Sequence, residues 1–435
     1  MKKTAIWICM VALCVSACAS GQDEAPADTP VLSEQQAALV PAVSIIKPEI
    51  MIDQTYALYI QDKAYVKAKY EPSQGCYRGA GICYDQTTGG DIGVFEKLTG
   101  TDHAIYTNHI KLGDEYPVAW ILSCIAQGKT PLLTILPPNR YAPYQEDLLL
   151  QTVRDAAMFQ IPVFIEFFPY DRNEGYDNGN YVEFYRKASR LFRQYVPTAA
   201  MVWGIAGADV YDSFSRYPGD SYVDWIGLRL QEDILPEGDI IYRSALRDMD
   251  FAYYSFQKQK PLMLSQISIS HYSTSDMGYY TQKAAGELAD IYRSIGADYP
   301  RIKAVIYESY NELNPAEENR QEWYDNYLIT DESLMMTQYK EALADERFLP
   351  VVETANDGGG ELLMRSPFPA YKADGAYYIG QKSLAYDMAV VGLANLEEYG
   401  VTIKGETYYP ANILKDTLGF RYKADDEDRR MVIVK

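Results

Sequence analysis

The chain has 435 residues, of which 48% are hydrophobic and 23% are charged. This length corresponds to two or three domains of roughly 150 residues each, and the composition excludes a mostly disordered, collagen-like or multi-span membrane protein. The formal net charge of −20 excludes nucleic acid as an expected partner, because that binding depends on basic side chains that release counterions. It also disfavours adhesion to anionic lipid through a basic surface.

The N-terminal segment has the features of a secretory signal peptide. Residues 1–17 combine two lysines with an apolar run that is too short to span a bilayer as a mature helix. The run ends in Val-Ser-Ala before Cys18, which resembles the bacterial lipobox; the alternative is ordinary cleavage nearby. We therefore predict an exported lipoprotein, anchored to the bacterial cell membrane through lipid on Cys18 and facing outside the cytoplasm. Residues 18–44 are acidic and contain proline, as expected for a disordered tether.

The spacing of cysteine and histidine does not indicate a metal site. After Cys18 the chain keeps Cys76, Cys83 and Cys124, and an odd number of cysteines cannot form a complete disulfide framework. Cys76 and Cys83 can pair around a short loop or remain buried free thiols, and the sequence leaves both open. There is no Cys-x-x-Cys pair and no short His-to-His motif. We expect no metal and no cofactor.

Apolar runs rich in β-forming residues alternate with amphipathic stretches from about residue 75 onward. Parallel strands need crossover helices, and eight such units in series can close on themselves. We therefore predict an α/β fold, a (β/α)8 TIM barrel followed by a small α+β domain; a doubly wound open sheet is the alternative. No glycine-rich phosphate loop follows an early strand, which disfavours a nucleotide-binding sheet. The predicted strands are 80–84, 103–107, 130–136, 162–168, 199–205, 223–230, 261–268 and 302–308.

The predicted barrel contains several distinctive segments: GCYRGAGICYD, VPTAAMVWGIAG, KPLMLSQISIS and YPGDSYVDWIG from Tyr217 to Gly227. They resemble glycoside hydrolase family 26, the retaining β-mannanase group within a larger clan of barrel glycosidases. The resemblance covers about residues 70–349, and with the preceding strands we assign residues 45–349 to this domain. It implies a polysaccharide or oligosaccharide partner, bound at the carboxyl ends of the strands.

The resemblance assigns the two catalytic carboxylates of the family to positions that have no carboxylate here. A retaining glycosidase needs an acid/base and a nucleophile about 5–5.5 Å apart. Tyr170 occupies the acid/base position and Gln266 the nucleophile position. A phenol is a poor proton donor at neutral pH, and a neutral amide does not form a glycosyl-enzyme ester. The family's aromatic residue at the end of the sixth strand is replaced by Gln231, a candidate substrate contact.

Other carboxylates lie near the same strand ends. Asp171 follows the acid/base position, and Glu308 closes the eighth strand; Glu174 and Asp85 are further candidates. An inverting mechanism tolerates carboxyl separations of ~6.5–9.5 Å, so a pair of these residues could substitute for the missing one. The alternative role of each is a solvated carboxylate or an acceptor for a sugar hydroxyl.

Glu166 interrupts an apolar predicted strand and shares side-chain parity with Phe168 and Tyr170. We expect it to point into the barrel. Arg229, on the sixth predicted strand, can supply the compensating charge, because alternate strands contribute to one interior layer. The sequence thus predicts a buried Glu166–Arg229 ion pair; a ligand contact of Glu166 is the alternative.

Tyrosine is frequent, with 39 residues against 13 Phe and 5 Trp. Flat apolar faces with a hydroxyl suit sugar rings and wet binding surfaces, although rim packing is their ordinary role. Trp203 is the first candidate for a sugar platform, because it closes the fifth predicted strand where the family also carries tryptophan. His271 is a candidate sugar contact or an exposed loop residue. The other aromatic candidates are Tyr84, Tyr106, Tyr211, Tyr272, Tyr307 and Tyr310.

The pattern of alternating apolar runs and helical stretches ends after Pro350. Residues 350–375 read as a linker, and residues 376–435 read as short strands around a helix. The turn GETYYP, the helix ILKDTLG and the last strand resemble a copper amine oxidase N-terminal-like domain. This stretch contains neither His nor Cys, so we expect no copper. The strands around residues 45–67 pack against either domain, and the sequence does not decide which.

Three functions remain open. The first is a surface lipoprotein whose catalytically degenerate barrel binds polysaccharide. The second is an active endo-acting glycoside hydrolase of β-mannanase or β-glucanase type that uses relocated carboxylates. The third is a structural protein of the cell envelope.

Overall fold

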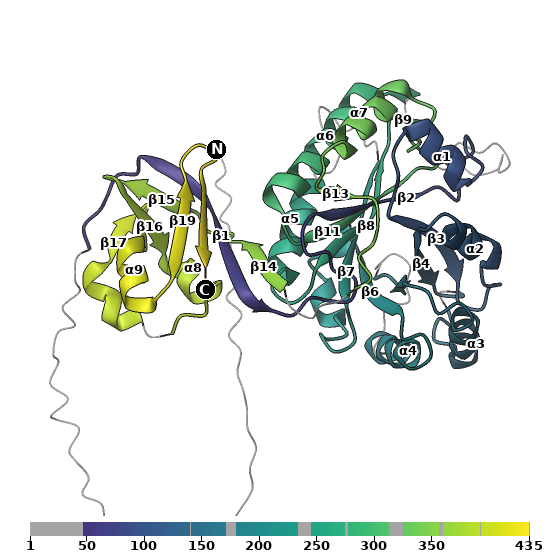
Figure 1. Ribbon diagram of the computed structural model, residues 1–435, viewed down its shortest axis with the longest axis horizontal. Coiled ribbons are helices and arrows are strands. Elements are labelled where there is room, and N and C mark those ends of the chain that lie inside the picture. Colours follow the sequence, from purple (N-terminus) through teal and green to yellow (C-terminus); the bar gives the residue numbers. More distant parts are fainter. Residues whose placement is uncertain are drawn as a thin grey trace, which may run out of the picture. The chain divides into compact units, whose positions relative to one another are not determined.

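The computed structural model describes residues 47–139, 141–170, 180–233, 245–274, 277–312, 325–355, 360–391 and 393–434 (Figure 1). The predictions for the signal peptide, the tether and Cys18 lie outside these residues, and so does Asp171. Within the described ranges, no helix combines the length and the hydropathy that a membrane span requires.

Eight parallel strands form a closed barrel. Each strand pairs with the next along the chain, and the last, β11, pairs with the first, β2, with Glu308 opposite Gly81. The predicted (β/α)8 TIM barrel is therefore confirmed, and the open-sheet alternative is wrong. The strands are β2 (Cys76–Gly81), β3 (Ile105–Lys111), β4 (Thr130–Leu136), β5 (Val163–Phe167), β6 (Ala199–Ala206), β7 (Trp225–Glu232), β8 (Leu262–Ile269) and β11 (Ile302–Glu308).

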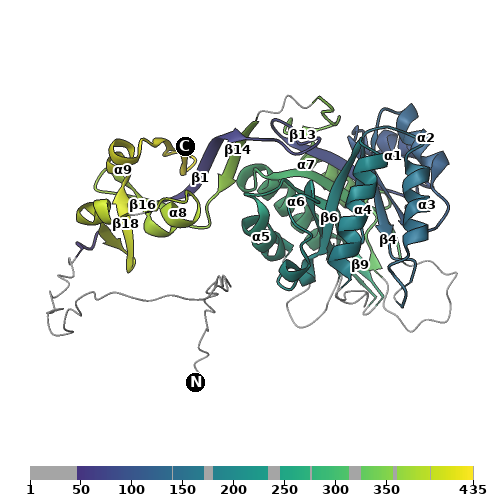
Figure 2. The ribbon, with the colours of Figure 1, turned by 90° about the horizontal axis from the view of Figure 1, so that it is seen from below.

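Helices lie around the outside of these strands, as Figure 1 and Figure 2 show. Local sequence explains their ends: Asp91 caps the first helix by accepting from the amide of Val94, and Gly100 ends it in the left-handed conformation at φ 62°. The helices are α1 (Ile92–Thr99), α2 (Val118–Ala126), α3 (Glu146–Ala156), α4 (Tyr181–Tyr195), α5 (Ala245–Phe256), α6 (Thr281–Asp298) and α7 (Ser333–Leu343).

Side-chain alternation divides the barrel core into two regions. Residues of one parity, such as Ile165 and Phe167, pack against the helices. Residues of the other parity, such as Phe164 and Val202, fill the interior near the amino ends of the strands, and the indole of Trp225 there donates to the carbonyl of Lys69 at 2.7 Å. The interior of the barrel near the amino ends of the strands is thus filled by apolar side chains, and the polar interior positions lie toward the carboxyl end.

Short elements follow several strand ends. The segment after β6 forms the 3-10 helices η2 (Gly207–Asp209) and η3 (Ser213–Arg216). The strands β9 (Tyr272–Ser273), β10 (Gly278–Tyr279) and β12 (Asp325–Asn326) form a small antiparallel sheet beyond β8 and β11. Strand β13 (Phe348–Leu349) pairs with the start of β2.

A second, eight-stranded sheet contains the C-terminal strands and one N-terminal strand. Strand β1 (Gln54–Tyr65) pairs with β14, β15 and β20 of that sheet. The strand within residues 45–67, whose packing the sequence left open, thus pairs within this sheet and not with the barrel to which the boundary 45–349 assigned it. The other strands are β14 (Gly360–Arg365), β15 (Ala370–Ala373), β16 (Ala376–Gly380), β17 (Val401–Ile403), β18 (Glu406–Pro410), β19 (Arg421–Asp425) and β20 (Arg430–Val434).

Three helices accompany this sheet: α8 (Gln381–Tyr386), the 3-10 helix η4 (Leu393–Tyr399) and α9 (Ala411–Leu418). Leu384 and Leu414 from the helices pack with Ile379 and Ile433 from the strands in one core. Strands β14 and β15 fall within residues 350–375, the range predicted to be a linker.

Candidate functional site

Polar side chains replace apolar ones at the carboxyl end of the barrel interior. Strands β3, β7, β8 and β11 contribute His109, Arg229, Gln266 and Glu308 there, each only partly exposed or buried. Residues 171–179, 234–244 and 313–324, which follow β5, β7 and β11 in the sequence, lie outside the described part.

Glu308 and His109 form a close pair. The Nε2 atom of His109 lies 2.5 Å from Oε1 of Glu308, and the carboxylate is 8% exposed. Burial alone would raise the pKa of Glu308, but the adjacent His109 and the positive charge of Arg229 together lower the pKa below its usual value. A Cβ at Gly81 would lie 2.6 Å from Cγ of Glu308, so glycine at this position makes room for the acid. Glu308 is thus held as a charged acceptor at the mouth of the barrel.

The end of β8 carries a β-bulge. Leu264 pairs with Val305 and Ile267 with Tyr307, so two residues of β8 oppose one residue of β11. The two residues that oppose one are Ser265 and Gln266, and both side chains contact interior groups. Because of this bulge, the side chains of two consecutive residues both point into the barrel interior.

Gln266 is held by an arginine. The Nε and Nη2 atoms of Arg229 donate to Oε1 of Gln266 at 2.9 and 2.7 Å, and Nε2 of Gln266 approaches the Ser268 hydroxyl at 3.4 Å. The amide oxygen therefore takes the fork-shaped donor pair that a carboxylate accepts best. Gln266, which the sequence resemblance assigns to the nucleophile position, is thus a neutral amide held in place by Arg229.

The predicted Glu166–Arg229 ion pair is wrong. Glu166 points into the barrel and is 1% exposed as expected, but its oxygens accept from the hydroxyls of Thr134 at 2.9 Å and Ser265 at 2.6 Å. Arg229 lies one layer higher and binds Gln266 instead. The partner was misassigned because the bulge in β8 brings a hydroxyl to Glu166, and a bulge leaves no periodic signal in the sequence.

Two glycines surround Glu166. A Cβ at Gly204 would collide with the Glu166 carboxylate, and one at Gly227 would lie 2.7 Å from Oε1. The absence of a side chain at both positions therefore leaves room for the Glu166 carboxylate in the middle of the barrel. This packing makes Glu166 part of the barrel interior, below the open end, and leaves the ligand-contact alternative without support from the described geometry.

Tyr170 is buried at 2% exposure, and its ring lies 6.1 Å from the ring of Tyr181 at the start of α4. Parity with Glu166 fails beyond β5 because Phe168 adopts a positive φ of 46°, which reverses the alternation of the chain. Tyr170 extends the pairing toward β6 through its amide, which donates to the Gly204 carbonyl at 2.7 Å. Tyr170, which the sequence resemblance assigns to the acid/base position, is thus buried against the ring of Tyr181.

Trp203 is not a sugar platform. Its side chain is fully buried, its indole donates to the Tyr181 hydroxyl at 3.0 Å, and its ring packs on Tyr217 and Phe256. The reason is parity: Val202 fills the interior, so Trp203 faces the helices. Tyr106 and Tyr307 are fully buried on the same side and are also excluded as platforms.

Other aromatic candidates remain accessible. Tyr84 is 64% exposed after β2, and Tyr211 is 51% exposed with its ring tilted against that of Phe251 at 4.0 Å. Tyr272 lies on β9 with its ring 4.6 Å from Tyr279, which is 77% exposed. These rings can present a face to a ligand, which Trp203 cannot. His271, in contrast, is 3% exposed and binds the Leu328 carbonyl at 2.9 Å, so the exposed-loop interpretation is wrong.

A second polar group surrounds Gln231. Its Nε2 atom donates to Asp233 at 2.8 Å and approaches the Tyr327 hydroxyl at 3.1 Å, and that hydroxyl donates to Asp233 at 2.6 Å. The ring of Tyr310 stacks on Tyr327 at 4.7 Å. Gln231 is exposed, so the amide and the carboxylate beside it are available to hydroxyl groups of a ligand.

Other candidates have structural roles. Asp85 is 1% exposed and accepts from the hydroxyls of Ser309 at 2.8 Å and Thr330 at 2.9 Å, so it ties loops together. Cys76 and Cys124 are buried free thiols and Cys83 is a half-buried free thiol, so the pairing of Cys76 with Cys83 does not form. Glu174 lies outside the described residues. Among the described residues, no group of three His, Cys, Asp or Glu side chains converges as metal ligands.

The sequence reasoning missed His109, Asp233 and Tyr327. His109 had a signal, because it follows Ile105 and Thr107 at the interior parity of one strand, but the predicted strand stopped at residue 107. Tyr327 had none, since it meets Gln231 from a separate segment of the chain, whereas Asp233 follows Gln231 by only two residues. A cavity of about 10 Å³ beside Glu308, lined also by Cys83, Tyr84 and Tyr310, has room for about one water molecule.

No family model matches the chain, and no curated protein matches it. Solved structures of glycoside hydrolases with a parallel eight-stranded barrel are similar to it. A GH26 beta-mannanase from Bacteroides ovatus covers 65% of this chain and 92% of its own at 12% identity and TM-score 0.42. Xylanase 10B from Thermotoga maritima covers 65% and 99% at 15% identity and TM-score 0.45. A GH113 beta-1,4-mannanase covers 64% and 100% at 8% identity and TM-score 0.43. At these values the similarity concerns the barrel architecture alone.

Proposed function

We propose that this protein is an exported surface lipoprotein whose barrel binds polysaccharide or oligosaccharide without hydrolysing it. The family 26 resemblance of the sequence supplies the ligand class, and the lipobox-like ending before Cys18 supplies the anchor. The C-terminal sheet, on the resemblance of GETYYP and ILKDTLG, is a copper amine oxidase N-terminal-like domain that carries no copper.

The observation that carries this proposal is the state of Gln266. Its amide oxygen is saturated by two donors of Arg229, so the position offers neither a negative charge nor a nucleophile. Tyr170, at the other catalytic position, is buried among rings. A retaining mechanism requires both carboxylates, and neither position provides one.

Binding groups remain at the same end of the barrel. Glu308 and the Gln231–Asp233 pair supply hydrogen-bonding atoms, and Tyr84 supplies an exposed ring beside Glu308. Sugars are recognised by this combination of a flat apolar face and convergent polar groups. The arrangement therefore favours retention of a ligand over its cleavage.

A second candidate function, hydrolysis through relocated groups, has one observation in its favour. Glu308 lies 2.5 Å from His109, and the two groups can exchange a proton. A glycosidase would also need a second carboxyl placed across the sugar. Asp171 and Glu174 are the sequence candidates for that role, and both lie outside the described residues.

The test combines binding and turnover on pure protein. Calorimetry with manno- and gluco-oligosaccharides should detect binding, and Tyr84→Ala should weaken it by about 0.5–1.5 kcal/mol, the scale of a stacked aromatic contact. Tyr386→Ala, which removes an exposed tyrosine of the C-terminal sheet domain, is the matched control and should bind as wild type. Turnover abolished by Glu308→Gln would establish the hydrolytic candidate. Binding to no glycan would leave only the structural envelope role.

A further inference from the structure

A cavity of about 410 Å³ lies at the amino ends of the barrel strands, opposite the candidate site. Its barrel wall is formed by the segment before β2, the start of β11, the end of α6 and the segment before β13. This volume is within the range of small-molecule pockets in proteins. The side chains on this wall that matter for the inference are Ser73, Arg301, Lys303 and Arg347.

Arg301 is fully compensated by its surroundings. It is 1% exposed, and its guanidinium pairs with the carboxylate of Glu71, donates to the Tyr65 hydroxyl at 2.8 Å and donates to the Gln257 carbonyl at 3.0 Å. A buried arginine with these partners is a structural element of the amino end.

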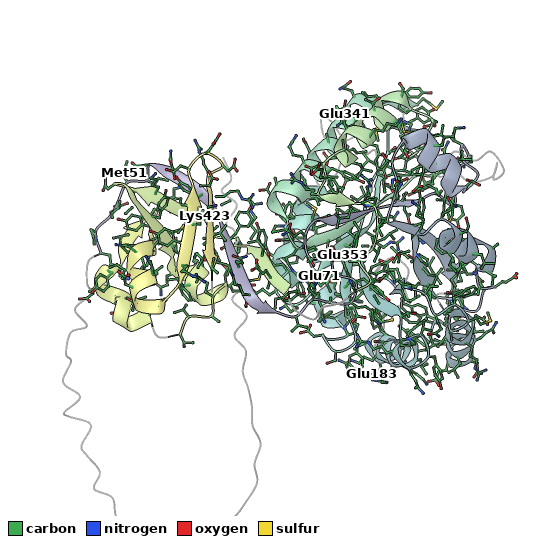
Figure 3. The ribbon with its side chains drawn as sticks, in the orientation of Figure 1. Met51, Glu71, Glu183, Glu341, Glu353 and Lys423 are labelled. Atoms are coloured by element: carbon green, nitrogen blue, oxygen red, sulfur yellow. The ribbon has the colours of Figure 1, made fainter. Side chains whose placement is uncertain are left out.

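Lys303 has no such compensation. Among the described residues, none accepts a hydrogen bond or forms an ion pair with its ammonium group. Burial lowers the pKa of Lys303, and the positive charge of Arg301 lowers it further. The carboxylates of Glu71 and Glu353 offset part of this lowering, and Glu353 also accepts from the amide of Ser73 at 3.2 Å. Glu361, which also lines the cavity, lies 3.5 Å from Lys63. Figure 3 labels Glu71 and Glu353 at this end of the barrel.

Arg347 adds a second cation to the same wall. A Cβ at Gly296 would collide with the Arg347 guanidinium, so the glycine lets this group lie across the end of α6. The carbonyl of Arg347 accepts from the amide of Cys76 at 2.8 Å, which fixes its backbone against β2. One side of the guanidinium pairs with Asp345 at 2.8 Å, and its remaining donors are free to serve a ligand.

We propose that this cavity binds a sugar-sized anion through an oxyanion group, either a phosphate or a carboxylate, held by Lys303 with Arg347 as second donor. The uncompensated ammonium group of Lys303 gains a partner when the anion binds, and a charge-assisted bond of this kind is stronger than a neutral one. The volume of the cavity exceeds what an isolated oxyanion fills, so the ligand carries a body of monosaccharide size. This site is separate from the carboxyl-end site and does not depend on the function proposed for it.

The test is titration calorimetry of the full chain at low ionic strength with glucose 6-phosphate, glucuronate and glucose. At least one of the two anions should bind and neutral glucose should not, and the preferred anion identifies the oxyanion. Lys303→Met should weaken the binding by about tenfold or more, while Lys303→Arg should retain most of it. Lys423→Met, at an exposed lysine of β19 labelled in Figure 3, is the matched control and should bind as wild type.

Two further readouts separate the proposal from loss of folding. Lys303→Met should be at least as stable as wild type, because it removes a desolvated charge. The affinity of wild type should fall as pH rises through the lowered pKa of Lys303, below the range of an exposed lysine. Binding of glucose equal to that of the anions, no binding of either anion, or wild-type affinity in Lys303→Met would each overturn the proposal.

Discussion

Arg229 donates two hydrogen bonds to a single oxygen of Gln266, from Nε at 2.9 Å and from Nη2 at 2.7 Å. Glu308 lies on β11, beyond β8 from Arg229; burial raises its pKa, and His109 and then Arg229 lower it below its usual value. The guanidinium of Arg229 thus interacts with both the neutral amide of Gln266 and the charged carboxylate of Glu308.

Restoring a carboxylate as Gln266→Glu should raise the free energy of unfolding by about 1 kcal/mol at neutral pH, because Arg229 gains a charged acceptor. Arg229 should lower the pKa of the introduced carboxyl, so the gain is present above the ordinary glutamate pKa and is lost as pH falls through the lowered one. Denaturant unfolding at several pH values measures this. Gln231→Glu, which sets a carboxylate beside Asp233, should destabilise instead; equal effects of the two variants would contradict the arrangement.

Gly204→Ala and Gly227→Ala should each destabilise the barrel by about 1–3 kcal/mol, because a Cβ at either position overlaps the Glu166 carboxylate. Combining Gly204→Ala with Glu166→Ala should cost less than the sum of the single changes, since the second removes the obstacle. Gly286→Ala on α6, where a Cβ meets nothing within 4 Å, is the control and should stabilise by up to about 1 kcal/mol. Strict additivity of the pair would show that Glu166 does not occupy that space.

Glu308→Gln should destabilise the protein at neutral pH and have less effect in acid. The pKa of Glu308 is lowered in the folded state, so its stabilising contribution is present above the pKa of an unfolded glutamate and disappears as pH falls through the folded value. Unfolding measured from pH 7 down to about pH 3 should therefore show the two curves converging. Glu341→Gln, at an exposed acid of α7, should give a constant difference near zero; a pH-independent effect at Glu308 would be the contrary result.

Trp203→Ala should lower the free energy of unfolding by about 3–5 kcal/mol, the range for truncating a buried large aromatic side chain. Trp203→Phe should cost less, because it keeps most of the ring packing on Tyr217 and Phe256. Any glycan affinity measured on the folded fraction should be unchanged in both variants. A selective loss of affinity without loss of stability would restore Trp203 as a ligand contact.

Cys18→Ala should release the protein from membranes into the soluble fraction, because one lipidated cysteine is the anchor expected from the sequence. Fractionation of expressing cells with an antibody against the barrel measures this. Cys83→Ala, at a half-buried free thiol, is the control and should remain with membranes. Unchanged fractionation of Cys18→Ala would remove the basis for the lipoprotein proposal.

The barrel itself could be predicted from the sequence because eight apolar runs alternate with helical stretches, a pattern that depends only on local periodicity. The inward direction of Glu166 followed from the same periodicity. Its partners did not, because the bulge at Ser265 and Gln266 shifts the register of β8 by one residue. The prediction that Trp203 is a sugar platform was wrong for a different reason. It followed the family resemblance, although Val202 points into the barrel and side-chain alternation therefore directs Trp203 toward the helices.

The pairing of β1 within the C-terminal sheet has a consequence for biosynthesis. Its partners β14, β15 and β20 all follow the barrel in the sequence, so β1 leaves the ribosome before any strand it can pair with. It must stay unpaired while the whole barrel is made, and an exposed apolar strand in that interval invites aggregation. For an exported chain this favours translocation in an unfolded state, and it means that a shortened gene ending after the barrel would encode a strand without a sheet.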